Sequence, residues 1–332
     1  MRLRNCIGSL LLTLMLCSCN SWLDVDLINQ SEESDLFSTE RGFSEALAGV
    51  YCDIAASNMY GQTLSFGMLD IMSRIYDYSQ IPNKMKIFRD YDYENKDMKS
   101  YIYLLWSSFY ANIAALNNIL EWSEKNASVL SDERRNQVRG EALALRGLLH
   151  FDIYRLFATD VKLDPTARVL PYQTKFGVKT SPVYSTMDYL NLVIGDLEDA
   201  VKYLENDPIK EVKPYQLGNG DDENKDGADL YVARMNYYAT KALLARVYLS
   251  MGGDKIKDAR RLAEEVIDCG KFALVDYERS LNTDEANKDL LFSDEHIFSL
   301  RGQNVKTDAE GVHKQITGTD GNVQMASGYQ SI

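Results

Sequence analysis

The chain has 332 residues, of which 45% are hydrophobic and 26% are charged, and its formal net charge is −13. The composition is that of a globular protein and excludes disordered and collagen-like classes, while the length fits two domains or one large helical domain. The negative charge argues against a nucleic-acid partner, because it repels phosphate backbones.

Residues 1–18 form a predicted export signal. Arg2 and Arg4 precede a short apolar run, residues 7–16, which is too short to cross a bilayer as a helix. Small residues then lead to Cys19. The tetrapeptide Leu-Cys-Ser-Cys that ends there resembles a bacterial lipobox, whose last cysteine is acylated and becomes the mature N-terminus. We therefore expect a lipid on Cys19; an ordinary signal peptide with an incidental cysteine is the alternative.

Residues 19–38 are polar and acidic and are predicted to be a lipidated tether, which leaves residues 39–332 as the folded body. Cys52 and Cys269 are the cysteines of that body. They could pair, because an exported protein meets an oxidising environment. Each lies in a helical pattern, however, where cysteine packs as a small apolar residue. We favour the unpaired interpretation. The lipid would then be the membrane anchor of the body.

Most of the body is predicted to be helical. Apolar residues recur at steps of three and four, for example at Phe43, Leu47 and Val50. Ser131 and Ser185 have the character of helix N-caps. These patterns predict helices over residues 39–54, 101–125, 132–157, 187–205, 232–251 and 255–269.

Between the helices the pattern weakens. Residues 73–99 are charged and rich in tyrosine without a clean period and are predicted to be a long loop, while residues 61–72 are ambiguous. Three prolines make residues 160–183 a connector with extended pieces. Residues 206–230 are predicted to be an acidic loop, and residues 295–300 are a candidate strand.

A faint internal echo occurs at an offset of 100 residues. Residues 141–149 match residues 241–249 at alanine, leucine and arginine positions. Each copy begins a predicted helix pair with a face of small residues, which lets neighbouring helices approach closely. The echo favours stacked helical hairpins of the TPR type.

Several motifs in a fixed order carry a family resemblance. Together they resemble the SusD/RagB family of Bacteroidetes outer-membrane lipoproteins. Besides the lipobox, the matching segments are Trp22–Val25, Phe37–Tyr51, Leu105–Ile119, Gly140–Phe157, Leu170–Tyr172, Asp196–Ala200 and Ala242–Leu249. Family members usually continue well beyond the length of this chain, so we expect it to lack much of their C-terminal part, as a fragment, a truncated reading frame or a short relative.

The resemblance implies an all-α dominated, SusD-like fold of TPR-like helical hairpins with long irregular loops. It also implies a function, which is capture of oligosaccharides or polysaccharides at the outer membrane, on the exterior face. The implied partner is a SusC-like TonB-dependent transporter, to which the glycan is delivered. The family is non-enzymatic, so we expect no catalysis and no required cofactor.

The tyrosine-rich segment supplies the candidate ligand site. Tyrosine rings can stack on the apolar face of a sugar, while neighbouring carboxylates bond its hydroxyl groups, as pockets generally combine apolar walls with few polar anchors. The alternative is a loop pinned by ordinary tyrosine packing. The predicted glycan-binding residues are Tyr76, Tyr78, Tyr91, Asp92 and Tyr93. We assign Trp106 to the core and leave the role of Trp122 open.

An acidic hexapeptide is a weak calcium candidate. Asp222, Asn224 and Asp226 stand at the oxygen positions of a calcium loop, and Gly227 stands where such a loop turns. The twelfth position is Ala233, where a bidentate glutamate is needed. We therefore prefer a solvated acidic loop to a Ca²⁺ site.

Catalytic motifs are absent from the sequence. The three histidines, His150, His296 and His313, are scattered, and His150 lies inside a helical pattern, where a structural role is expected. The sequence contains no zinc-protease, nucleophile-elbow or phosphate-loop motif. The alternatives to glycan delivery are a scaffold that binds no glycan, a protein that captures peptides and, last, a surface glycosidase, since acidic pairs abound.

Overall fold

The computed structural model describes residues 33–74, 83–177, 179, 181–211, 231–282 and 292–317. Helices dominate this part of the chain. They are α3 (Glu40–Ile54), α4 (Met68–Ser73), α5 (Asn83–Arg89), α6 (Lys96–Lys125), α7 (Asp132–Phe157), α8 (Thr186–Tyr203), α10 (Tyr237–Met251), α11 (Lys255–Asp268), α12 (Tyr277–Ser280) and α13 (Val305–Thr317), with 3₁₀ turns η2 (Pro208–Lys210) and η5 (Ser293–Glu295).

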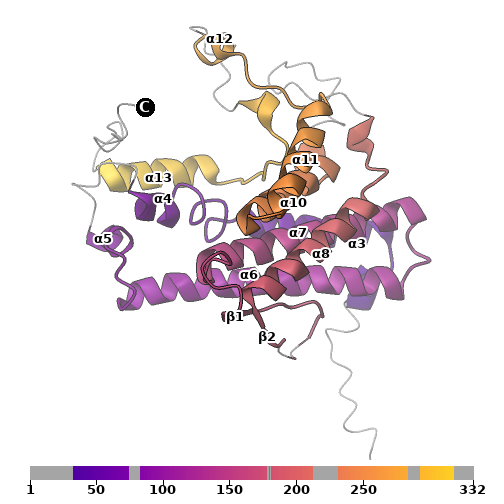
Figure 1. Cartoon of the computed structure of the whole chain (residues 1–332), viewed down its shortest axis with the longest axis horizontal. Helices are drawn as coiled ribbons and strands as arrows, with labels where there is room; N and C mark the ends of the chain where they lie inside the picture. Colours follow the sequence, from indigo (N-terminus) through magenta and orange to yellow (C-terminus); the bar gives the residue numbers. More distant parts are fainter. Residues whose placement is uncertain are drawn as a thin grey trace, which may run out of the picture.

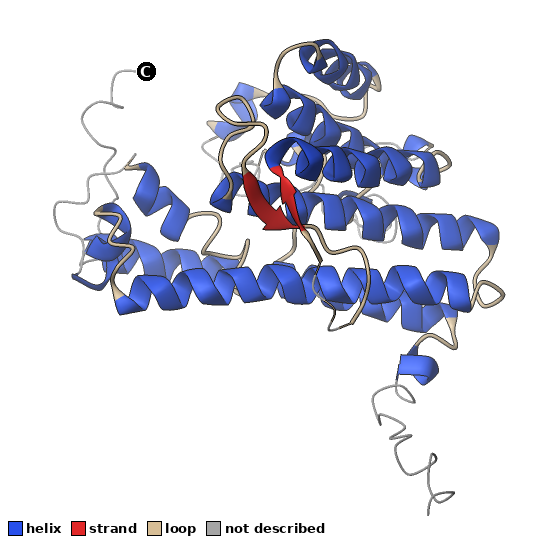
Figure 2. Cartoon of the chain, turned by 60° about the horizontal axis from the view of Figure 1, so that its bottom comes forward, coloured by secondary structure: helices blue, strands red, loops and turns tan. Residues whose placement is uncertain are grey.

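The long helices pack as successive pairs. α6 contacts α7, α7 contacts α8, and α10 contacts α11, while α3 lies against α6 and α7. Figure 1 shows α4, α5 and α13 gathered near one end of α6. The described strands, β1 (Arg168–Pro171) and β2 (Val183–Ser185), form one antiparallel hairpin with Leu170 opposite Tyr184. The hairpin lies on the outer side of the helices, where it contacts α7 and α8 (Figure 2). The expected fold, dominated by α-helices, is confirmed.

Local sequence signals set several helix starts. Thr39 Oγ1 accepts a hydrogen bond from the Gly42 amide, and Ser131 Oγ accepts one from the Arg134 amide at 3.2 Å. Ser185 caps α8 in the same way. These caps satisfy amides that a helix leaves without partners at its first turn. The predicted helix at residue 232 begins later, because Asn236 is the cap and Tyr237 is the first helical residue.

One hydrophobic core joins these helices. It extends from Phe37 to Val312 and includes the stripe of α6 that was predicted from its spacing, with Phe109, Ile113 and Leu116 fully buried. α7 lies in the middle and is buried almost all round between its Val138 and Tyr154. Most buried apolar residues of the described chain therefore belong to one connected core, and Leu204, Ile209 and Tyr237 form a small second cluster.

Two glycines of α7 allow the closest helix contact. A Cβ atom at Gly140 would lie 2.5 Å from Leu204 Cγ, and one at Gly147 would lie 2.7 Å from Leu197 Cδ2. Both contacts are to α8 or its C-cap. The small-residue face inferred from the internal echo is thus present in the α7–α8 pair, and the second copy, α10, begins the α10–α11 pair.

The centre of the bundle holds a buried ion pair. Arg146 of α7 bonds both carboxylate oxygens of Asp196 on α8, at 2.6 Å each, and its third donor reaches Asn117 of α6 at 2.7 Å. The Tyr172 hydroxyl, which follows β1, donates to the same carboxylate. One charge pair therefore connects three helices and the hairpin, with its donors and acceptors largely satisfied.

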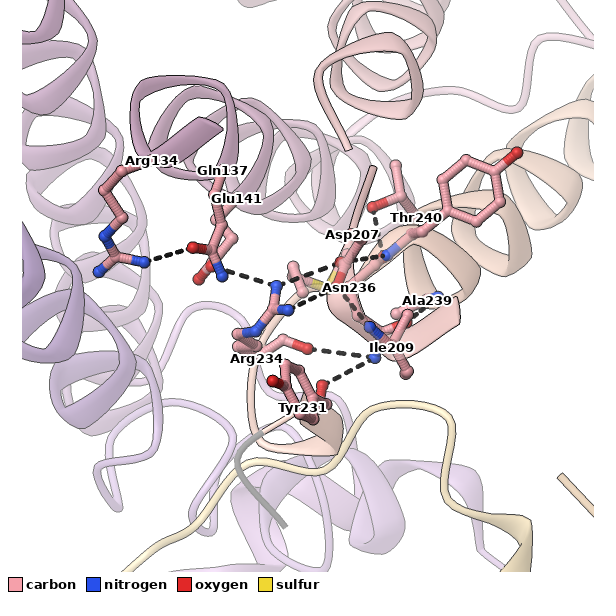
Figure 3. A network of polar contacts seen from close by, with 12 residues as sticks. Arg134, Gln137, Glu141, Asp207, Ile209, Tyr231, Arg234, Asn236, Ala239 and Thr240 are labelled. Carbon is pink, nitrogen blue, oxygen red and sulfur yellow. Dashed lines mark hydrogen bonds and ion pairs between the residues drawn. The ribbon is translucent and has the colours of Figure 1, made fainter. Parts of the chain in front are cut away.

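A second polar network fixes the start of α10 (Figure 3). Arg234 reaches between Asp207, at 2.6 Å, and Glu141, at 3.2 Å. The Tyr51 hydroxyl donates to Glu141 and accepts from the Met235 amide. Burial raises the pKa of the Glu141 carboxyl, while Arg234 opposes that shift. The network therefore has a structural role, because it joins α3, α7 and the segment before α10.

Three sequence expectations about elements are wrong. Residues 73–99 are not one loop, because α5 forms there, with Met85 and Phe88 buried one turn apart, and α6 begins at Lys96 behind the Asn95 cap. The candidate strand 295–300 is irregular after η5, because its backbone groups bond the segment before α10 instead of a strand. The end of the predicted tether belongs to the body, because Phe37 is buried there.

The two cysteines of the body do not pair. Cys52 is exposed, and Cys269 is half-buried; both are free thiols. Among the described residues, no helix is both long enough and apolar enough to cross a bilayer.

Candidate functional site

A cavity of about 320 Å³ opens near the amino-terminal end of α6. Its walls come from the loop after α3, from α4 and α5, and from the first turns of α6. The lining residues are Ser57, Asn58, Gln62, Thr63, Gly67, Met68, Ile71, Met85, Phe88, Tyr101 and Leu104. They come from several successive elements between residues 57 and 104, so the cavity exists only because these elements pack around it.

The lining combines uncharged polar groups with an apolar wall. Ser57, Asn58, Gln62 and Thr63 bring hydroxyl and amide groups, which donate and accept hydrogen bonds. The lining also includes Met68, Met85 and Phe88, whose ring meets the Tyr101 ring edge-on at 5.0 Å. Such a surface suits a neutral molecule that has both apolar faces and many hydroxyl groups.

The loop that carries the polar groups is held by its own hydrogen bonds. The Tyr60 hydroxyl donates to Asp152 of α7 at 2.5 Å, and burial raises its pKa well above the ordinary value. Asn58 donates to the Ser108 hydroxyl of α6. Ser57 donates to Asp308 of α13, so this helix is tied to the cavity wall. The polar side of the cavity is therefore fixed to α6, α7 and α13.

Arg74 and Tyr91 form a clasp between α4 and α5. Both residues adopt left-handed backbone conformations, with φ of 57° and 54°. The Arg74 guanidinium donates to the Arg89 carbonyl and lies 4.8 Å from the centre of the Tyr91 ring. The Tyr91 hydroxyl donates to the Met72 carbonyl. These contacts hold Tyr91 in place and cover one face of its ring, while the side chain stays 40% exposed.

The other predicted ligand residues have different positions. Asp92 and Tyr93 are exposed in the turn between α5 and α6, and Tyr93 is 50% exposed. Tyr76 and Tyr78 lie outside the described residues, as do Cys19 and the calcium candidates Asp222, Asn224 and Asp226. In the part of the chain that the structure describes, no group of three or more histidine, cysteine or acidic residues could hold a metal ion.

Sequence reasoning missed the residues of α6 that face this region. Tyr101 is 46% exposed, Tyr103 is 69% exposed and Leu104 is 55% exposed. Tyr103 and Leu104 lie on other faces of the helix than the buried stripe, whereas Tyr101 lies at its edge, one turn before the buried Leu105. The available signal was the presence of large apolar and aromatic residues outside the stripe at the start of that helix.

His150 and the two tryptophans have structural environments. His150 is fully buried, its ring stacks on Tyr172 at 3.8 Å, and burial lowers its pKa to about 3. Trp106 packs against the core beside Phe157, as expected. Trp122, whose role was open, stacks on Phe37 at 5.7 Å.

Comparison with protein families finds one match over residues 21–216, more than half of the chain. It is the SusD-like family described as "starch-binding associating with outer membrane". None of the curated proteins matches the chain.

Solved structures of similar fold come from several Bacteroides species. A SusD-like carbohydrate-binding protein from Bacteroides vulgatus is 17% identical, with a TM-score of 0.58, and the match covers 83% of this chain and 54% of that one. A SusD superfamily protein from Bacteroides fragilis is 21% identical, with a TM-score of 0.57 and coverages of 80% and 56%.

A SusD homologue from Bacteroides thetaiotaomicron is 19% identical, with a TM-score of 0.54 and coverages of 76% and 44%. The chain spans about half the length of these structures. At such identities the likeness shows the fold.

Proposed function

Because the chain belongs to the SusD-like family, we propose that it binds glycans at the outer membrane and delivers oligosaccharides to a SusC-like TonB-dependent transporter. In this proposal the lipid on Cys19 anchors the body, which faces the cell exterior. The protein acts by binding and release and performs no catalysis.

The observation that carries the proposal is the chemistry of the cavity beside α6. Its hydroxyl and amide oxygens can accept hydrogen bonds from sugar hydroxyls, its amide groups can also donate, and its apolar wall can cover the carbon face of a ring. Tyr101 lies half-exposed at this wall, so it can contact a ligand that enters. Tyrosine suits this task because it has an apolar face and a polar tip.

The uncharged lining also favours a sugar over a charged ligand. A carboxylate or an ammonium group buried in the cavity would lose its hydration without a compensating charge from the lining. Capture of an extended peptide would leave the charges of its termini and side chains to be paired elsewhere. The lining therefore favours neutral glycans, and starch is the first to test, in keeping with the family description.

Affinity electrophoresis of the full chain in a sugar-free detergent tests the proposal. Starch and other polysaccharides are placed in the gel, and the wild type is compared with Tyr101→Ala. We expect one polysaccharide to retard the wild type and Tyr101→Ala to lose most of this retardation, while no shorter sugars are released. Tyr277→Ala, which removes an exposed tyrosine of α12, is the matched control.

The other functions are separate outcomes of the same work. A chain that no polysaccharide retards, but that co-purifies with a TonB-dependent transporter, would be a scaffold. Release of shorter sugars would identify a glycosidase. Binding of peptides instead of glycans would show that the protein captures peptides.

A further inference from the structure

A second, shallow hollow lies beside the cavity on the first turns of α6. Its volume is about 580 Å³, and it is wide open to solvent. It is lined by Glu94, Lys96, Lys99, Ser100, Tyr103 and Leu104. Leu104 also lines the cavity, so the two hollows are neighbours that share one side chain.

Helix geometry explains this arrangement. At 3.6 residues per turn, Tyr101 and Ser108 lie on one side of Leu104, toward the loop after α3. Lys96, Ser100 and Tyr103 lie on the other side of Leu104. Leu104 is therefore a ridge, and the hollows lie on its two flanks.

We propose that the shallow hollow is a second subsite, which binds the continuation of the glycan chain whose first unit occupies the cavity. This inference rests on the proposed function and names its ligand more closely as an oligosaccharide of several units. The chain would cross Leu104, whose side chain is 55% exposed and can contact the apolar face of a sugar at the crossing.

The shallow hollow has the groups that a sugar unit needs. Tyr103 is 69% exposed, so its ring is available as a stacking surface. Lys99 pairs with Glu94 at 2.7 Å. The pair uses one ammonium hydrogen and one carboxylate lone pair, so Lys99 can still donate hydrogen bonds to sugar hydroxyls and Glu94 can still accept them. Because this hollow is open, water remains around the bound sugar, and we expect a moderate contribution to affinity compared with that of the cavity.

The test compares short and long fragments of one glycan by isothermal titration calorimetry on the full chain. The probes are the disaccharide and the heptasaccharide of the polysaccharide that most strongly retards the wild type, which are maltose and maltoheptaose in the case of starch. We expect Tyr103→Ala to bind the heptasaccharide about tenfold more weakly and the disaccharide unchanged. Tyr101→Ala should weaken both.

Tyr277→Ala is the control, because Tyr277 is also 69% exposed but lies on α12. Thermal melts of all variants check that they fold. The inference is overturned if Tyr103→Ala binds the heptasaccharide like the wild type, or if it weakens both probes equally. Failure of the wild type to bind any glycan is a different result, because it would reject the proposed function itself.

Discussion

At the scale of single residues, the most consequential feature is the charge buried in α7. Arg146 and Asp196 are nearly inaccessible, with side chains 8% and 11% exposed. Buried charged side chains are tolerated when each makes several hydrogen bonds and ion pairs. Removal of one partner leaves the charge of the other buried without a counter-charge. The sequence showed this arginine only as part of a repeated motif, and the pairing with Asp196 became visible in the packed helices.

We expect Asp196→Asn to lower the free energy of unfolding by about 3–5 kcal/mol, because it leaves the Arg146 charge buried without its counter-charge. Urea denaturation measures the change. Glu264→Gln is the matched control, since it removes the acid of an exposed pair with Arg260, and it should leave stability nearly unchanged. Equal effects of the two substitutions would contradict the structural role.

His150 makes stability depend on pH. In the folded protein burial lowers its pKa to about 3, whereas in the unfolded chain the ordinary value is 6.5. As the pH falls below about 6.5, the unfolded chain therefore takes up a proton that the folded protein does not, and stability falls by up to about 1.4 kcal/mol per pH unit.

His150→Gln should remove this contribution between pH 6 and pH 4. The measurement is urea denaturation of both proteins across that range, because the carboxyl groups titrate in both and cancel in the difference. Parallel pH profiles would show that His150 does not carry the effect.

At the scale of elements, the contact between α7 and α8 depends on glycine. Gly140 and Gly147 let Leu204 and Leu197 pack against the backbone of α7. Glycine costs helix stability by itself, so its presence at these two places is explained by the close approach and not by helix propensity. α8 also contains Gly195, which has open space around it.

Gly140→Ala and Gly195→Ala should therefore change the free energy of unfolding in opposite directions. The first should destabilise the protein by about 1–3 kcal/mol, because the new Cβ overlaps Leu204. The second should stabilise it by up to about 1 kcal/mol through helix propensity. Denaturant titration of the two variants measures both changes. Stabilisation by Gly140→Ala would contradict the prediction and would show that α8 moves away from the new methyl group at little cost.

At the scale of the whole molecule, the segment that leads from the predicted anchor enters the core directly. Phe37 is 2% exposed and packs between Phe43, at 4.8 Å, and Trp122, at 5.7 Å. Asn126 donates a hydrogen bond to its carbonyl. The tether therefore attaches near the end of α6 opposite to the cavity, because Trp122 and Asn126 lie at the carboxyl end of that helix.

We expect Phe37→Ala to destabilise the body by about 3–5 kcal/mol, because it opens a cavity in the core. Leu36→Ala is the control, since its neighbouring side chain is 38% exposed. Thermal unfolding should show a large decrease in Tm for the first variant and a small one for the second. A small decrease for both would mean that the segment is only loosely attached.

Sequence patterns predicted the helical class, most of the long helices and the caps at Ser131 and Ser185, whereas the Thr39 cap was seen only in the structure. These features depend on residues within one or two turns of each other, so a linear pattern contains them. The short helix α5 escaped this reasoning, because two buried residues on two turns do not make a recognisable period.

The two hollows beside α6, in contrast, became visible only in the folded structure. Among the predicted ligand residues, Tyr91 contacts Arg74, and none of the described ones lines the two hollows, whose walls include Tyr101, Tyr103 and Leu104. The reason is physical. A cavity is space that several packed elements leave unfilled, and its walls at Ser57, Met85 and Tyr101 meet only after the chain has folded.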